Sequence, residues 1–195
     1  MKLAISNSVL IYPFILQPSL KHLEILCPTH PVALQNVSII QPPALETLRI
    51  EDDRYLTNDF LRSLLRGTAS LKKLTLRACP KLDFNSLDWL AEDGHADNIV
   101  ELSIDGIPGF NDECSKEMGR WKNLERLNVS RTSISGLGVV HIVDRKDSAL
   151  KWIGLDACEN VARDAVEYVR KKGLACSNKS VWSEQNAKGA KKVRY

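Results

Sequence analysis

The sequence predicts an α/β solenoid, in which short parallel strands form a concave sheet and helices cover its convex side. A phrase of the form leucine-x-x-leucine-x-leucine, or a close aliphatic variant, occurs six times in the 195 residues. The steps between successive phrases are 25, 26, 28, 25 and 26 residues, which indicates a repeat architecture. Several segments between the phrases have apolar residues at helical spacing. The phrases begin at Leu20, Leu45, Leu71, Ile99, Leu124 and Leu150.

Each phrase predicts one strand. In Leu74-Thr75-Leu76 the two leucines should point inward and the threonine outward, because side chains alternate along a strand. One short strand cannot bury its apolar side alone, so successive strands are expected to stack about 4.8 Å apart into a continuous parallel sheet. Lys2 to Ile5 has the same alternation. We therefore expect six to seven repeats.

The segments between strands predict helices. Thr57 can cap a helix that begins at Asn58, with Phe60, Leu61, Leu64 and Leu65 at helical spacing. In the first repeats, prolines favour irregular connections instead. The expected helices are 58–66, one containing Leu87 and Leu90 that ends near Gly94, 114–121, 137–143 and 163–172.

The repeats should form one domain over residues 1–173, followed by a basic and flexible tail over residues 174–195. The tail is rich in Ser, Asn, Lys and Gly, a composition that does not favour a packed core. Because the chain begins directly in a strand with no polar capping unit, we expect a fragment, or a first repeat covered by another protein. The tail cations are Lys179, Lys188, Lys191, Lys192 and Arg194.

The cysteines predict an intracellular protein, cytoplasmic or nuclear. There are five, an odd number, and no pair has C-x-x-C spacing, which indicates buried free thiols and no disulfide framework. The sequon at Asn128 falls inside a predicted strand, so we interpret the three Asn-x-Ser matches as chance. The sequence contains no run of 18 apolar residues, so we expect no membrane-spanning helix. A signal peptide is not favoured, because the first 16 residues contain Pro13 and several polar residues.

Motifs for catalysis are weak, and we expect no enzyme activity, no cofactor and no metal. The segment from Gly136 to His141 begins like a dinucleotide-binding fingerprint, but histidine replaces the third glycine. Cys27 and His30 would supply two zinc ligands, whereas a structural zinc site needs four. The net charge of +3 is too small to predict nucleic-acid binding.

A cysteine follows the last strand aliphatic by three residues in Leu74-x-Leu76-x-x-Cys79 and in Ile153-x-Leu155-x-x-Cys158. With the threonine-aspartate helix entry at residues 57–59, this pattern over residues 20–173 resembles the cysteine-containing class of leucine-rich repeats. The pattern is incomplete, because the cysteine position holds Asp53, Ile107 and Thr132 in other repeats.

Repeats of this class occur most often in F-box proteins, the substrate receptors of cullin-RING ubiquitin ligases. The resemblance implies that the repeats hold a protein substrate for an SCF-type ligase, whose adaptor would be bound by an F-box that is missing from this sequence. The basic ending resembles that of fungal F-box proteins that act at replication forks. Two alternatives are a ligase-independent scaffold or inhibitor, and a chromatin or nucleic-acid factor that uses the basic tail.

The outward strand positions predict a protein-binding surface on the concave face. They alternate in charge between neighbouring repeats, which suits a protein partner, whereas a nucleic-acid groove would carry mostly Lys and Arg. Trp152 is an interface candidate because tryptophan is enriched in hot spots, although it could instead pack beneath the tail against Trp182. The predicted partner-binding residues are Arg49, Glu51, Lys73, Arg77, Glu101, Asp105, Arg126, Asn128, Trp152 and Asp156.

Overall fold

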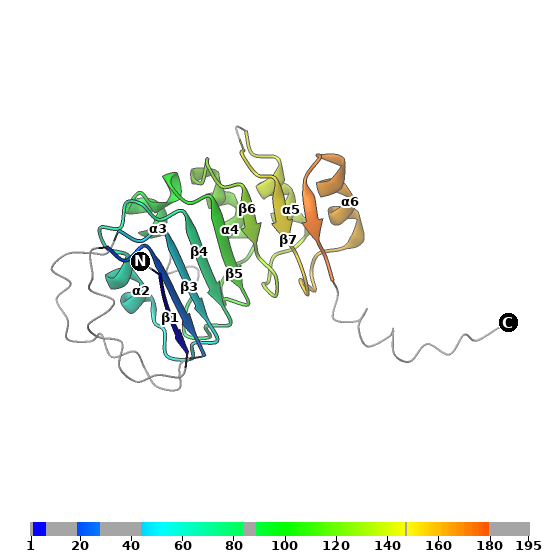
Figure 1. Ribbon diagram of the computed structural model, residues 1–195. Helices are drawn as coiled ribbons and strands as arrows, with labels where there is room; N and C mark the ends of the chain where they lie inside the picture. Colours follow the sequence, from blue (N-terminus) through cyan, green and yellow to red (C-terminus); the bar gives the residue numbers. More distant parts are fainter. Residues whose placement is uncertain (1, 7–18, 28–43, 84–88, 147, 180–195) are drawn as a thin grey trace, which may run out of the picture.

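A computed structural model describes residues 2–6, 19–27, 44–83, 89–146 and 148–179. Within them the chain forms one parallel sheet of eight strands that follow one another in sequence order. Figure 1 shows the helices on one side of this sheet, so the chain winds as a strand-and-helix repeat with a solenoid-like arrangement. The strands are β1 Lys2–Ser6, β2 His22–Leu26, β3 Thr47–Glu51, β4 Lys73–Arg77, β5 Glu101–Asp105, β6 Arg126–Asn128, β7 Trp152–Gly154 and β8 Ala175–Ser177.

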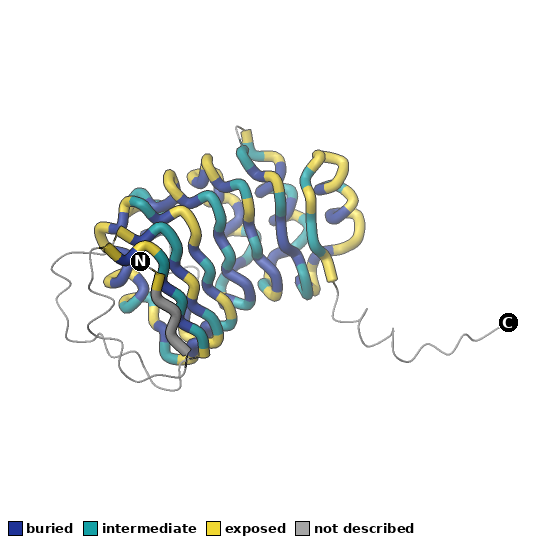
Figure 2. The backbone as a smooth tube through the Cα atoms, viewed as in Figure 1, coloured by how far each residue is buried: buried dark blue, intermediate teal, exposed yellow. Residues whose placement is uncertain are grey.

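The register of the sheet is the one that the leucine phrases predict. Leu48 pairs with Leu74, and Leu74 with Leu102, so equivalent positions of successive repeats lie side by side. In β3 the inward Leu48 and Ile50 are buried, while Arg49 between them is exposed. Figure 2 shows the buried positions running along the strands and continuing beneath the sheet. The inward aliphatics therefore form one continuous core with the helices.

The sheet contains one strand that the sequence analysis missed. The composition predicts a flexible tail over residues 174–195, but Ala175–Ser177 pairs in parallel with β7, so the repeat region continues beyond residue 173. This strand lacks a leucine phrase: its inward side chain is Cys176, which pairs with Ile153. Residues 180–195, including Trp182 and four of the tail cations, lie outside the described residues.

In the part of the chain that the structure describes, five α-helices occupy predicted connections. Thr57 caps the first of them by accepting a hydrogen bond from the Phe60 amide at 3.3 Å, as predicted. Asn111 and Ser135 cap two others in the same way. The helices are α2 Asn58–Leu65, α3 Trp89–Glu92, α4 Asp112–Glu117, α5 Gly136–Val143 and α6 Arg163–Lys171, with 3-10 turns η2 His95–Asp97 and η3 Met118–Arg120.

A left-handed residue follows the strand segment in six successive repeats. Its backbone amide donates a hydrogen bond to the carbonyl of the next repeat, as from Ala78 to Asp105 at 3.0 Å. The positive φ turns the chain away from the sheet while this bond is kept, and only one of the six residues is a glycine. The six are Cys27, Asp52, Ala78, Gly106, Arg131 and Ala157.

The cysteine position is structural. The Cys79 thiol lies 3.8 Å from the Ile50 carbonyl, and the Cys158 thiol lies 3.2 Å from the equivalent carbonyl of Val129. Burial raises the pKa of Cys79 to about 11, so this thiol stays protonated at neutral pH. Cys79 and Cys158 are therefore buried packing residues, as predicted. The prediction is wrong for Cys27, which is exposed beside Asp52.

Candidate functional site

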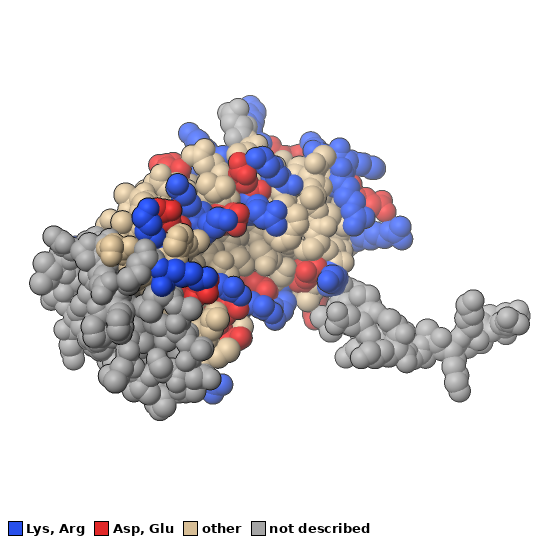
Figure 3. Space-filling model, viewed as in Figure 1, with Lys and Arg blue, Asp and Glu red and all other residues tan. Residues whose placement is uncertain are grey.

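The predicted binding residues lie on the open face of the sheet, which we define as the face carrying the outward side chains of β2 to β7. Parallel pairing in register arranges these side chains in columns that run across the strands, such as Arg49 beside Thr75 and Thr75 beside Ser103. Figure 3 shows cationic and anionic side chains interspersed over the molecule on this side. The open face is therefore a patterned polar surface, as the alternation of charges in the sequence predicts.

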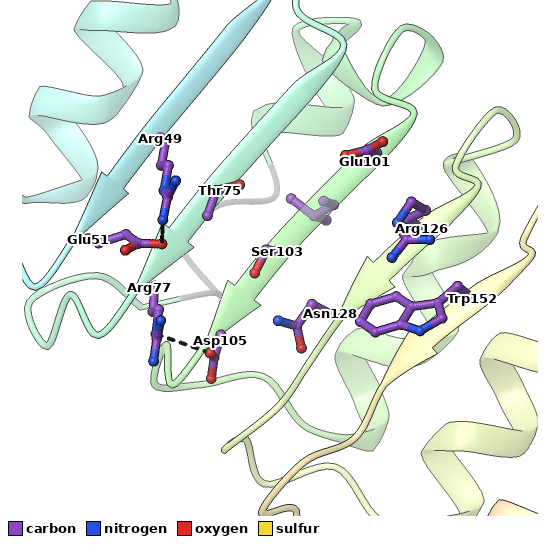
Figure 4. A pocket seen from close by; sticks show the side chains of 11 residues that line it. Arg49, Glu51, Thr75, Arg77, Glu101, Ser103, Asp105, Arg126, Asn128 and Trp152 are labelled. Atoms are coloured by element: carbon purple, nitrogen blue, oxygen red, sulfur yellow. Dashed lines mark hydrogen bonds and ion pairs between the residues drawn. The ribbon is translucent and has the colours of Figure 1, made fainter. Parts of the chain in front are cut away.

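A hollow of about 330 Å³ lies on the open face between β3 and β7. Eight of the ten predicted residues line it, and Figure 4 shows their side chains on successive strands. Lys73 and Asp156 do not line the hollow. The eight are Arg49, Glu51, Arg77, Glu101, Asp105, Arg126, Asn128 and Trp152, joined by Thr75, Leu102 and Ser103.

Ion pairs neutralise part of the charge around the hollow. Arg49 donates to Glu51 two residues further along the same strand, at 3.0 Å. Lys73 pairs with Glu101 of the neighbouring strand at 2.9 Å. These pairs are partly exposed, so each is expected to stabilise the fold by no more than about 1 kcal/mol.

Asp105 is shared by two arginines. Its two carboxylate oxygens lie 3.4 Å from Arg77 Nε and 2.7 Å from Arg131 Nε, and only 13% of its side chain is exposed. Sequence reasoning missed Arg131 because this residue lies after the strand, outside the alternating positions. Its left-handed backbone, with φ of 56°, begins the turn from which the side chain reaches back to the preceding repeat. The repeated position after each strand was the signal that could have identified it.

Trp152 is half-buried, and residues of its own sheet cover it. The guanidinium of Arg126 lies over the indole, 4.5 Å from the ring centroid. A Cβ placed on Gly154 would lie 2.7 Å from Cη2 of the indole and 2.5 Å from Oδ1 of Asn128, so the absence of a side chain at 154 leaves room for both. The alternative contact with Trp182 lies outside the described residues.

Asp156 has a different place from the one predicted. Its carboxylate accepts the backbone amide of Lys179 at 2.6 Å, and its own amide donates to Ser130 Oγ at 3.0 Å. These bonds join the turn after β7 to both neighbouring repeats. Asp156 thus holds the end of the sheet together and does not face the hollow.

The described part of the chain shows no metal-binding centre. No group of three or more His, Cys, Asp or Glu residues there is arranged to hold a metal ion. Trp89 and Trp121 are core residues, with 5% and 3% of their surface exposed. Among these same residues, no helix combines the length and the apolar character needed to cross a membrane. His30, which with Cys27 would supply two zinc ligands, lies outside the described residues.

Comparison of the chain with protein-family models gives no match, and comparison with curated proteins gives none either. The functional interpretation therefore depends on the repeat pattern and on the geometry of the open face.

Proposed function

We propose that the chain is a leucine-rich-repeat horseshoe of the cysteine-containing class, and that its concave, open face binds a segment of another protein. Three features support this class: the leucine phrases with a period of 25 to 28 residues, the parallel strands in sequence order, and the equivalent carbonyl contacts of Cys79 and Cys158. Repeat solenoids of this kind use their extended concave surface for recognition.

The observation that carries the proposal is the composition of the hollow. It brings together a tryptophan, arginines, carboxylates and neutral hydrogen-bonding side chains from five adjacent strands. Tryptophan and arginine dominate protein hot spots, and the alternation of charges suits a partner with complementary charges. A groove for nucleic acid would be lined mostly by cations.

The resemblance to F-box proteins extends this proposal to a role in substrate recognition for an SCF-type ubiquitin ligase. In that role the chain would hold the substrate non-covalently, and other subunits would transfer ubiquitin. The ligase role rests on the repeat class alone. The experiment therefore tests the ligase role separately from binding by the open face.

The test is affinity capture of the tagged full chain from its native cell extract, followed by mass spectrometry. The variant reverses three open-face charges, Arg49→Glu, Arg77→Glu and Arg126→Glu. The matched control reverses three charges on the helical side, Arg66→Glu, Arg120→Glu and Arg170→Glu, which are all exposed. Circular dichroism and thermal unfolding verify that both variants keep the fold.

We expect the open-face variant to lose specific partners that the wild type and the control retain. If both variants capture the same proteins, the open face is not the recognition surface. Co-purification of cullin and adaptor subunits would support the ligase role. A stoichiometric partner without any ligase subunit would contradict that role and favour a scaffold or inhibitor.

A further inference from the structure

Three outward side chains form the floor of the hollow. Thr75, Ser103 and Asn128 occupy the same position in β4, β5 and β6, and the register places each beside the next. All three are half-buried. Asn128 Oδ1 accepts the Ser130 amide at 3.1 Å, which leaves its amide nitrogen to donate into the hollow. The floor therefore presents a row of hydrogen-bonding groups about 4.8 Å apart.

Arg126 differs from the other cations of the hollow. Arg49 pairs with Glu51, and Arg77 with Asp105, but no carboxylate of the described residues forms an ion pair with Arg126. Its neighbour in the register is Glu101, whose carboxylate pairs instead with Lys73. Arg126 thus contributes a positive charge that the described residues around it do not neutralise with an ion pair.

The contact with Trp152 holds this charge in place. A guanidinium stacked on an indole keeps its N–H groups free at the edge of its plane, where they can bind a planar anion. The ring itself is held over Gly154. Because both groups are already ordered, less conformational entropy is lost when a ligand binds.

A second positive charge lies on the other side of the floor. Arg77 and Arg131 share the single carboxylate of Asp105, so the three groups together carry a net charge of +1. This charge is spread over two guanidiniums that already bind a carboxylate. Among the described residues, Arg126 is therefore the guanidinium of the hollow that has no carboxylate partner, and the positive potential around Arg77 and Arg131 is weaker.

We infer that the hollow binds an acidic segment of a partner protein, with an aspartate or glutamate carboxylate received by Arg126 and the Asn128 amide over Ser103. One free guanidinium with one amide donor matches a singly charged planar carboxylate. A phosphate dianion is a poorer match, because the other arginines remain bound to carboxylates. This inference deepens the proposed function and rests on it.

The experiment is an NMR titration of the ¹⁵N-labelled full chain with pools of twelve-residue peptides. Each pool has one central position occupied by Glu, Gln, phosphoserine or Lys, and degenerate uncharged flanking positions. The readout is the indole N–H resonance of Trp152, identified through Trp152→Phe. Arg126→Gln is the test variant, and Arg49→Gln is the control because it lies in the same hollow but is paired.

We expect the Glu pool to bind at least about tenfold more tightly than the Gln pool, since a charge-assisted hydrogen bond is gained. Arg126→Gln should abolish this difference, and Arg49→Gln should retain it. Higher salt should weaken binding of the Glu pool more than that of the Gln pool.

Equal binding of the Glu and Gln pools, or no shift at millimolar peptide, would overturn the inference. So would a difference that survives Arg126→Gln. Tighter binding of the phosphoserine pool than of the Glu pool would also overturn it, and would show that the hollow recognises a phosphorylated side chain. If the peptides show no selectivity while capture from extract still depends on the open face, only the inference of an acidic partner is wrong. If capture ignores the open face, the proposed function is wrong as well.

Discussion

The indole of Trp152 lies across the strand toward Gly154, two residues further along β7, where a Cβ would sit 2.7 Å from Cη2 of the ring. This relationship explains how a large aromatic side chain can occupy an outward strand position. The glycine leaves space for the ring edge, and the guanidinium of Arg126 in β6 lies over the ring. Trp152 is thereby part of the sheet surface before any partner binds.

Gly154→Ala should displace the indole or the Asn128 amide, because the added methyl group would overlap with both. We expect a loss of about 1–3 kcal/mol in the free energy of unfolding, measured in urea. Gly119→Ala is the control, since a Cβ there would meet nothing within 4 Å. It should be neutral or stabilising by up to about 1 kcal/mol. Equal effects of both substitutions would contradict the packing described for Trp152.

The left-handed turns after the strands predict an unusual response to glycine. Ala78 has φ of 50°, a conformation that costs a non-glycine residue roughly 1–2 kcal/mol. Ala78→Gly should therefore leave stability unchanged or raise it by up to about 1 kcal/mol. The same change in helix α6, Ala165→Gly, should lower stability by about 1 kcal/mol or more. Urea denaturation of the two variants tests whether their effects differ in this direction.

Asp53 predicts a dependence of stability on pH. It occupies the cysteine position of its repeat with 2% of its surface exposed, and burial raises its pKa, although the amides of Tyr55 and Leu56 partly offset this. A raised pKa in the folded state means that this carboxyl group favours folding when protonated. Its contribution is present below pH 4 and is lost as the pH rises through the folded-state pKa.

Asp53→Asn keeps an acceptor for the two backbone amides and removes the buried charge. We expect the variant to exceed the wild type in stability at pH 7, with a smaller difference at pH 4. Asp97→Asn, at an exposed site, serves as the control and should show no such trend. A gain that does not change between pH 4 and pH 7 would show that the charge of Asp53 is not its cause.

The thiols should differ in their reactivity. Cys27 is exposed, but desolvation and the nearby Asp52 raise its pKa, so maleimide labelling should be slow at neutral pH and quicken steadily as the pH rises. Burial also raises the pKa of Cys79 and Cys158, which should remain unlabelled until the chain unfolds. Peptide mapping by mass spectrometry after timed labelling measures each site. Labelling of Cys79 at the rate of Cys27 in the native protein would contradict the buried position of Cys79.

The local pattern of the sequence determined the repeat period, the inward leucines and most helix positions. These features depend on alternation along a strand and on helical spacing, and both patterns involve residues that are close in the sequence. Thr57 and the helix after it are an example, because the cap and the apolar spacing lie within one short segment. The open-face columns followed from the same alternation once the phrases were aligned.

The tertiary structure alone decided which of these side chains act together. The β8 strand forms because β7 offers it an edge with which to pair, although its own sequence lacks the leucine phrase. Arg131 reaches Asp105 from a left-handed turn that lies outside the alternating strand positions, and the Asp156 carboxylate accepts the Lys179 amide. Within the described residues, Arg126 has no carboxylate partner, and the neighbouring Glu101 pairs with Lys73. Such choices depend on distances between repeats, which local sequence does not encode.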